Sequence, residues 1–442
     1  MISSWLGNPL TGFRSLYRKS GQARWAMTSQ ILTSGTNFAT SVIIIRSLGL
    51  DEFGRFSLGF LLLMIVRSFL DGAVLNPIAS IAPKLWSTSQ PAYRGFALVK
   101  VLAFALATSA ILTLTAKPLG NLIGSPWLSQ LAIALAASSF TANLADFFRR
   151  YQFIEGRPAH AFAIDAVRYS VQLLAILLLA YPLHAHFDAV AALYAMALSS
   201  GLAAVVGIAV FGRITWRAPL NRIMWPRHWN FVKWMIPGVA MEAVQNAVPQ
   251  FLGNALLGEA ALGLIRAAQQ ISNILNLPVY ALQQILPSMA ASRLRSAGYR
   301  SMAHFLRNIG YAMGVASLAL GATVILASKE IAQLMGITDA SRFGTLLGLF
   351  MLLNFVFALR FPSTIFVNTV EDPRANFLSS ALGATIAVVL GWLLIGRLGE
   401  VVVPVIYIIL VIATWAFLVT WKRVKHEKYD EEFSVKIESW KS

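Results

Sequence analysis

The sequence has no cysteine and little charge. A chain of 442 residues without Cys has no disulfide, no thiolate metal site and no cysteine nucleophile. Charged residues make up 12% of the chain, against roughly 25% in a soluble globular protein. Among the charged residues, acidic ones are the fewer, 19 Asp and Glu against 36 Lys and Arg. This composition excludes an ordinary cytosolic enzyme.

Apolar residues, in contrast, are abundant. They form 57% of the sequence, and the mean hydropathy is +0.65. Together these values indicate a polytopic membrane protein. The net charge of +17 therefore lies in short segments between apolar runs, and it does not predict nucleic acid as a partner.

Twelve apolar runs have the roughly 20 residues that a helix needs to cross a hydrocarbon core of about 30 Å. The fold class that they predict is all-α. The predicted spans cover residues 27–46, 56–79, 96–116, 127–148, 161–180, 189–211, 231–256, 263–287, 305–327, 343–367, 377–395 and 401–421.

Basic residues alternate along this series of spans. Of the 36 Lys and Arg, 28 fall in the N-terminal segment, in every second connection and in the tail. Because cytoplasmic loops carry an excess of Lys and Arg, both termini are predicted to be cytoplasmic. A miscount by one span would have scrambled this alternation, so the charges support the number twelve independently of hydropathy.

The two halves of the chain repeat each other. The heptapeptide LGLDEFG at 48–54 recurs as LGEAALG at 257–263, and at the same offset Asn37 is matched by Asn246. Tyr93 and Arg94 before the third span are likewise matched by Tyr299 and Arg300 before the ninth. Parallel six-span repeats are typical of alternating-access transporters, which bind their solute between the repeats.

These features divide the chain into five predicted segments. Residues 1–25 form a cytoplasmic leader, either an amphipathic helix on the membrane surface or a disordered basic segment. Two six-helix bundles follow, at 26–212 and 231–421, joined by a basic cytoplasmic linker at 213–230. The last segment, 422–442, is a cytoplasmic tail of mixed charge.

The repeated Leu-Gly heptapeptide, the twelve spans and the prolines that end the second span (Pro77 and Pro83) carry a resemblance over nearly the whole chain. The sequence resembles the polysaccharide transporter family, the O-antigen and exopolysaccharide flippases of the multidrug/oligosaccharidyl-lipid/polysaccharide exporter superfamily. The resemblance implies a MATE-like fold of two pseudo-symmetric six-helix bundles. It also implies translocation of an undecaprenyl-pyrophosphate-linked oligosaccharide from the cytoplasmic to the periplasmic leaflet of the bacterial inner membrane.

The resemblance extends to partners and cofactors. Lipid-linked oligosaccharide, membrane lipids, a polysaccharide polymerase and chain-length proteins are the implied partners, and a monomer is expected. The sequence has no phosphate-binding loop and only weak metal signals, so no cofactor is expected beyond H⁺ or Na⁺ as coupling ion. We expect no enzymatic activity.

Such a cargo requires a cationic path, because sugars and a pyrophosphate are penalised in hydrocarbon, and ionisable residues inside spans mark paths of this kind. Arg67, near the middle of the second span, and Arg266, in the eighth, are the predicted pyrophosphate contacts. Asp71 follows Arg67 by four residues and can pair with it, so a purely structural ion pair is equally consistent. Arg266 can instead be an arginine that reaches the interface.

Three further charges are candidates for gating or ion coupling. Glu242 lies about ten residues into the seventh span, between Pro237 and Pro249. A carboxylate at that depth should have a raised pKa, which suits a coupling site, although a neutral structural Glu fits as well. Asp146 and Arg360 lie at corresponding depths in the two halves, either as an inward gate or as side chains that reach the headgroups.

Uncharged polar residues supply hydrogen bonding suited to sugar hydroxyls, or else join helices to each other. The candidates for substrate contact are Asn37, Asn246, Asn273 and Asn276.

Two other functions remain open. A cation-coupled multidrug exporter of the same superfamily would need an acidic or neutral cavity, and the arginines within the spans argue against one. A membrane-embedded glycan polymerase or ligase would need a sizeable periplasmic loop, whereas all the predicted outer loops are about fifteen residues or fewer.

Overall fold

The computed structural model describes residues 9–82, 85, 89–215, 218–370 and 372–425, and all the regular structure in these residues is helical. The longer helices are α1 (Pro9–Leu70), α3 (Gln90–Leu122), α4 (Ala132–Ile154), α5 (Pro158–Ala180), α6 (Ala189–Val210), α7 (Ala218–Leu257), α8 (Glu259–Leu275), α9 (Leu277–Leu326), α11 (Ala340–Thr369), α12 (Pro373–Leu398) and α13 (Val402–Val424). Shorter elements are the π-helical turn η1 (Asp71–Leu75), α2 (Asn76–Ile81), η4 (Pro126–Ser129), η5 (His184–His186) and α10 (Ser328–Met335).

Two of these helices are bent at single glycines where the sequence predicts loops. Within α1, Gly49 has φ 84° and ψ −178°, and within α9, Gly298 has φ 78° and ψ 176°. Only glycine adopts this conformation without strain. In α1 the glycine joins the first two spans at a corner rather than by a loop. In α9 it joins the end of the eighth span, which α8 begins, to the ninth.

The fold is all-α, as predicted. Eight stretches of the described residues are long and apolar enough to cross a membrane, and the first of them, Met27–Ile81, contains the corner at Gly49 and thus two spans. The remaining predicted spans are α4, α7 and α8, which are more polar or shorter. Twelve spans are consistent with this arrangement, and the chain is a multi-pass membrane protein.

The chain divides into two compact units. The first contains Met1–Thr40, Leu70–Ala116 and Gln130–Val232, and the second contains Ser41–Phe69, Lys117–Ser129 and Lys233–Ser442. The second unit thus includes the repeated heptapeptide of both halves. The division into bundles at 26–212 and 231–421 stays a prediction. The leader falls partly within α1, which is helical from Pro9, and residues 1–8 and 426–442 lie outside the described part of the chain.

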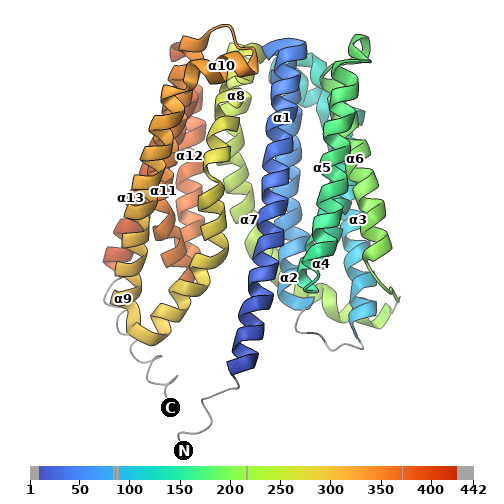
Figure 1. The fold of residues 1–442 in the computed structure, drawn as a ribbon, viewed down its shortest axis with the longest axis vertical. Helices are drawn as coiled ribbons and strands as arrows, with labels where there is room; N and C mark the ends of the chain where they lie inside the picture. Colours follow the sequence, from blue (N-terminus) through green and yellow to red (C-terminus); the bar gives the residue numbers. More distant parts are fainter. Residues whose placement is uncertain (1–8, 83–84, 86–88, 216–217, 371, 426–442) are drawn as a thin grey trace, which may run out of the picture. The chain divides into compact units, whose positions relative to one another are not determined.

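In the first unit, an aromatic cluster joins α4 to the end of α6. Phe147, Phe148 and Tyr151 are fully buried and surround the Phe211 ring, with ring centroids 4.9–5.4 Å apart. A side chain at Gly207 would collide with Phe148, so the glycine allows α6 to approach α4 closely. Figure 1 shows α4, α5 and α6 running side by side.

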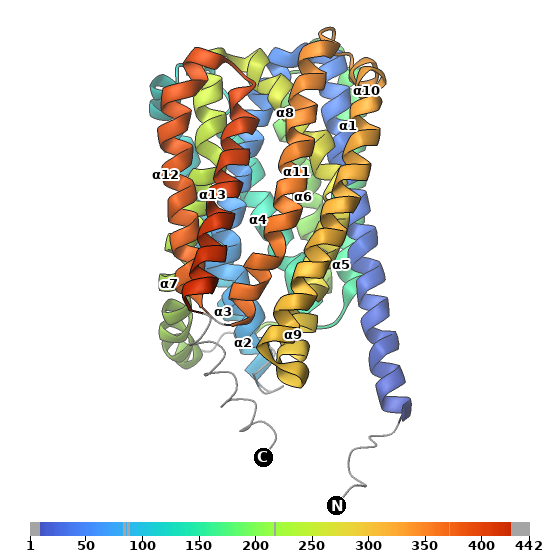
Figure 2. The same ribbon diagram turned by 90° about the vertical axis from the view of Figure 1, so that its left-hand side faces the viewer.

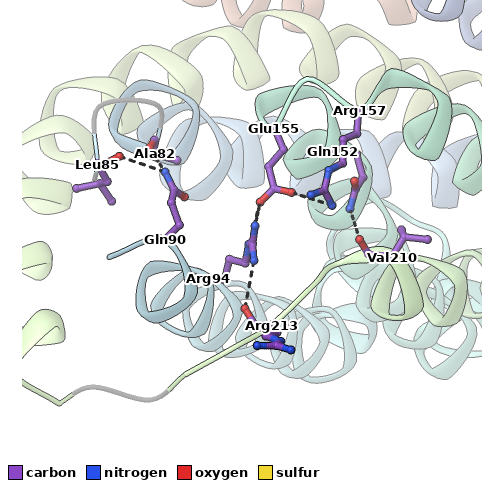
Figure 3. A network of polar contacts seen from close by, with 9 residues as sticks. All are labelled: Ala82, Leu85, Gln90, Arg94, Gln152, Glu155, Arg157, Val210 and Arg213. Atoms are coloured by element: carbon purple, nitrogen blue, oxygen red, sulfur yellow. Dashed lines mark hydrogen bonds and ion pairs between the residues drawn. The ribbon is translucent and has the colours of Figure 1, made fainter. Parts of the chain in front are cut away.

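A network of polar contacts ties the connections of the first unit together (Figure 3). Arg94 of α3 donates from Nε to Glu155 Oε1 at 2.8 Å and from Nη1 to the carbonyl of Arg213 at 3.3 Å. Arg157 contacts the other oxygen of Glu155 at 3.5 Å. Arg94, a predicted repeat position, therefore fastens the α4–α5 turn to the chain that follows α6.

Lys100 of α3 supplies a hydrogen-bond donor that the backbone of the second span lacks. Pro77 has no N–H, so the carbonyl of Ala73, four residues earlier, lacks its helical donor. Lys100 Nζ donates to this carbonyl at 2.9 Å. The ammonium also contacts His228 Nδ1 at 2.9 Å, and the other ring nitrogen of His228 lies 2.9 Å from Tyr93 Oη.

In the second unit, α11 packs between α9 and α13 (Figure 2). Gly310 and Gly314 of α9 face α11. A Cβ added at Gly310 would lie 3.0 Å from Pro362, and one added at Gly314 would lie 2.8 Å from Leu359. Small residues four apart let helix backbones approach closely inside a membrane.

The repeated heptapeptides contact each other at equivalent positions. A side chain added at Gly54, the last residue of the first copy, would collide with the carbonyl of Glu259, the third residue of the second copy. A side chain at Gly263 would in the same way collide with the carbonyl of Leu50. The final glycine of each copy thus leaves room for the backbone of the other copy, which is why both copies end in glycine.

Candidate functional site

A polar stripe runs along one face of α7 in the second unit. Glu242, Asn246, Gln250 and Asn254 recur every fourth residue, which places them on one side of a helix over about 18 Å. Gln250 and Asn254 are buried, whereas Glu242 and Asn246 are exposed. Asn254 donates to Ser125 Oγ at 2.6 Å. The exposed end of the stripe is therefore the part that is open to a solute.

Tyr407 of α13 connects this stripe to α8. Its hydroxyl donates to the carbonyl of Asn246 at 2.6 Å and accepts from Gln250 Nε2 at 3.2 Å. Arg266 of α8 lies close enough to interact electrostatically with Tyr407. Arg266 Nη1 donates to Gln269 Oε1 at 3.0 Å, one turn further along α8. Arg266 therefore lies in a polar region formed by α7, α8 and α13.

Arg266 differs from Arg149 and Arg168, whose partners are aspartates, because its described partners are neutral. Among the described residues, no carboxylate lies within ion-pair distance of it, and its hydrogen bond goes to an amide. A cation in the membrane without a carboxylate is costly and usually functional. Arg266, a predicted pyrophosphate contact, is thus placed where an anion would balance its charge.

Glu242 and Arg360 are brought together from α7 and α11. They lie close enough for an attractive interaction, and Arg360 Nε is buried without a hydrogen-bond partner among the described residues. The two residues were predicted as separate candidates for coupling and for gating. In the structure Arg360 lies near Glu242, at the exposed end of the α7 stripe.

Asn276 joins two helices. Its Nδ2 donates to Asn354 Oδ1 at 2.9 Å, and Ser272 Oγ donates to the same oxygen at 3.0 Å. All three residues are buried, so their hydrogen bonds hold α8 against α11. Asn273, between them in sequence, is exposed and is free of this network. Of these two predicted asparagines, Asn273 is therefore the one whose side chain is open to a solute.

Three predicted residues lie on α1 and the turn that follows it. Arg67 and Asn37 of α1 are half-buried, and so is Asp71, the first residue of the π-helical turn η1. Such π-helical turns are frequent at functional sites, and this one is followed directly by Asn76 and Pro77. The roles assigned to these residues stay predictions.

Asp146 belongs to a pair of crossed ion pairs in the first unit. Arg168 Nη1 of α5 lies 2.8 Å from Asp146 Oδ1 of α4, and Arg149 Nε of α4 lies 2.6 Å from Asp165 Oδ2 of α5. Each helix contributes Asp-x-x-Arg, and the antiparallel arrangement matches each Asp with the other helix's Arg. Asp146 thus forms an ion pair with Arg168. The gating role predicted for Asp146 and Arg360 stays a prediction.

Sequence reasoning missed several of these residues although the signals were present. The four-residue spacing of Glu242, Asn246, Gln250 and Asn254 marks the α7 stripe, and the repeated Asp-x-x-Arg marks the crossed ion pairs. Tyr407 gives no such signal, because one tyrosine in an apolar span is ordinary.

The sequence gives no match among models of protein families and none among curated proteins. Solved structures do match over most of the chain. An inward-facing multidrug resistance MATE family transporter of the MOP superfamily has a TM-score of 0.71 at 15% identity, covering 91% of this chain and 96% of its own. The lipid II flippase MurJ, in an inward closed conformation, has a TM-score of 0.70 at 10% identity, covering 93% and 90%.

A third structure, a MOP superfamily transporter from Pyrococcus furiosus described as having a binding pocket of reversed polarity, has a TM-score of 0.65 at 13% identity, covering 91% of this chain and 94% of its own. These neighbours are transporters and flippases, and none of the three is an enzyme. At identities this low the similarity establishes the fold: the chain has the fold of the MOP superfamily transporters, and the predicted MATE-like fold is confirmed.

Proposed function

We propose that the protein is a flippase that carries an undecaprenyl-pyrophosphate-linked oligosaccharide from the cytoplasmic to the periplasmic leaflet of a bacterial inner membrane. The observation that carries the proposal is Arg266, a cation among the spans whose described partners are all neutral. A multidrug exporter that binds cationic drugs gains nothing from such a residue. A phosphorylated lipid headgroup gains a charge-assisted contact.

The rest of the polar region suits the remainder of this cargo. Asn246, Asn273 and Gln269 offer amide groups for sugar hydroxyls around Arg266. Arg360 adds a second cation whose Nε is buried without a described partner. Arg67 is proposed to contact the pyrophosphate as well. The polyprenyl tail stays in the bilayer, where it costs nothing.

The membrane potential supplies a driving force for this direction. Moving one negative charge outward is favoured by about 2.3 kcal/mol per 100 mV when the inside is negative. A headgroup with two negative charges would gain about twice that amount. In this proposal, H⁺ or Na⁺ coupling at Glu242 adds to the potential rather than replacing it.

The test uses proteoliposomes that contain a fluorescent undecaprenyl-pyrophosphate-linked oligosaccharide, with flipping scored by accessibility to an external glycosidase. Arg266→Ala should reduce the flipping rate about 10- to 100-fold, which is the equivalent of one lost charge-assisted contact. Arg266→Lys should keep part of the rate because it keeps the charge. Arg397→Ala, an exposed arginine at the end of α12, is the matched control and should flip at the wild-type rate. A wild-type rate in Arg266→Ala would remove Arg266 from the mechanism and withdraw the proposal.

The second candidate function, a cation-coupled exporter of small molecules, is favoured by the exposed carboxylate of Glu242 on α7. The same vesicles, with a pH or Na⁺ gradient imposed at zero potential, test the coupling that both functions assign to Glu242. A coupling carboxylate predicts that Glu242→Gln abolishes the response to the gradient. An exporter also predicts uptake of a cationic dye by the wild type, whereas the flippase proposal predicts none.

A further inference from the structure

A cationic pocket lies in the second unit, away from the α7 stripe. Its volume is about 590 Å³, and it is lined by α9, α11 and α13. Four cations line it, Arg300 and Arg307 from α9 and Lys422 and Arg423 from α13, together with His304. Among the described residues that line it, none is acidic. The described residues that line the pocket therefore carry a net positive charge.

The cations are brought together despite their mutual repulsion. Arg307 lies close enough to Lys422 to disfavour its charge, and Arg307 Nη2 contacts His304 Nδ1 at 2.9 Å. Asp372, the residue before α12, is engaged by Lys425 Nζ at 2.9 Å and Trp421 Nε1 at 3.0 Å. An anion bound between Arg307 and Lys422 would relieve the repulsion.

The shape of the surface indicates what kind of anion fits. Arg300, His304 and Arg307 lie on one face of α9, and the same face continues through Tyr311, Val315 and Leu318, since these residues follow each other at intervals of three or four. The last three are 61%, 68% and 52% exposed. Positive charge at one end of a helix face and exposed apolar side chains along the rest match a phosphate headgroup with an acyl chain.

We infer that this pocket binds an anionic phospholipid of the cytoplasmic leaflet, with its phosphate between Arg307 and Lys422 and an acyl chain along Tyr311, Val315 and Leu318. Basic pockets between helices on the cytoplasmic side bind such headgroups. The inference depends on the proposed orientation, which places this end of α9 and α13 in the cytoplasmic leaflet. It does not depend on the cargo or on Arg266.

Two other occupants are possible in principle. The acidic stretch of residues 427–432 follows α13 in sequence, and the proposed polyprenyl cargo also bears phosphate. Neither fits the surface as well. A peptide carboxylate makes no use of the apolar face, and the cargo's oligosaccharide would have to share the pocket with Trp415 and Phe366.

The experiment measures lipid binding to the full chain by native mass spectrometry in detergent, with added phosphatidylglycerol or phosphatidylcholine. Wild-type protein should bind phosphatidylglycerol at least tenfold more tightly than phosphatidylcholine. The double variant Arg307→Gln/Lys422→Gln should bind it about 10- to 30-fold more weakly. The matched control Arg213→Gln/Arg222→Gln removes two exposed cations of the first unit and should bind like wild type. Thermal unfolding of all three proteins checks that they are folded.

Several results would overturn the inference. Equal binding of the two lipids, or an unchanged affinity in the Arg307/Lys422 variant, would show that the pocket does not select anionic lipid. Displacement of phosphatidylglycerol by equimolar undecaprenyl phosphate would assign the pocket to the cargo. Tighter binding when residues 427, 430, 431 and 432 are changed to their amides would assign it to the chain's own tail. Because no transport is measured, a failed flipping assay leaves this inference standing.

Discussion

At the scale of single residues, the arginines within the spans differ in how their charge is balanced. Arg168 and Arg149 each face an aspartate on a neighbouring helix, whereas Arg266 faces an amide and a phenol. A buried cation with its own carboxylate is part of the scaffold, because removing one partner strands the other charge. A cation with neutral neighbours is the one available to an external anion.

The crossed ion pairs give a first prediction. Asp146 and Arg168 are 7% and 8% exposed, and breaking a buried pair costs about 3–5 kcal/mol. Asp146→Asn should therefore lower the thermal unfolding temperature and the yield of folded protein. The exchange Asp146→Arg/Arg168→Asp should restore part of both, while Arg150→Gln, an exposed neighbour, should change neither. A double exchange no better than Asp146→Asn would mean that the pair does not act as a pair.

His228 gives a prediction about pH. Burial and the nearby Lys100 and Arg227 charges lower its pKa from 6.5 to about 3. Because a lysine ammonium only donates, His228 Nδ1 accepts from Lys100, and the ring proton lies on Nε2 toward Tyr93. Between about pH 6.5 and 3, His228 is protonated in the unfolded chain and neutral in the folded chain. Stability is therefore lost as the pH falls through this window.

The unfolding temperature of wild-type protein, measured from pH 7.5 down to pH 5, should fall more steeply than that of His228→Gln. His304→Gln, which changes an exposed histidine, is the control for the loss of a histidine elsewhere in the chain. Parallel curves for wild type and His228→Gln would show that folding does not lower the pKa of His228.

At the scale of helices, the sequence predicts which helices exist better than it predicts where each helix begins and ends. Runs of apolar residues locate the spans because each span must be apolar throughout its length. The connections at Gly49 and Gly298 were predicted as loops, since turn residues and charge normally mark loops. The structure makes them corners within continuous helices, because one glycine with positive φ suffices to turn the chain.

The contact between the repeated heptapeptides gives a prediction at this scale. Gly54→Ala and Gly263→Ala each force a methyl group against a backbone carbonyl, which cannot move aside as a flexible side chain could. Overpacking of this kind costs about 1–3 kcal/mol, so both variants should unfold at lower temperature in a size-exclusion thermostability assay. Gly348→Ala is the control, because nothing lies within 4 Å of its added carbon. Wild-type stability in both heptapeptide variants would refute the proposed close contact.

At the scale of the whole molecule, duplication and charge alternation predict the fold class, since both are properties of the entire chain and survive local errors. The site was harder to predict. Arg266, Glu242 and Asn246 stand out because polar residues are rare in spans, but their partners Tyr407 and Asn354 become visible only when distant helices are brought together. Pairings between helices depend on rotation about each helix axis, which the sequence pattern of one helix leaves open.

The absence of cysteine makes the predicted orientation easy to test. Single cysteines can be introduced at Thr338, between α10 and α11, and at Arg213, after α6; both positions are exposed. A membrane-impermeant maleimide applied to intact spheroplasts should label Thr338→Cys. It should label Arg213→Cys only after the membrane is opened. The wild-type chain is the unlabelled control, and the reverse pattern would invert the orientation and withdraw the lipid inference with it.

The reciprocal fit of Gly54 on Glu259 and Gly263 on Leu50 has a consequence for the evolution of this chain. Each copy of the heptapeptide supplies both the hollow and the backbone that fills it, so neither copy can drift alone. Lineages that gain a side chain at one glycine should show a compensating shortening or reshaping of the other copy. The ancient duplication would thus be recorded longest at this contact, after the rest of the two halves has diverged beyond recognition.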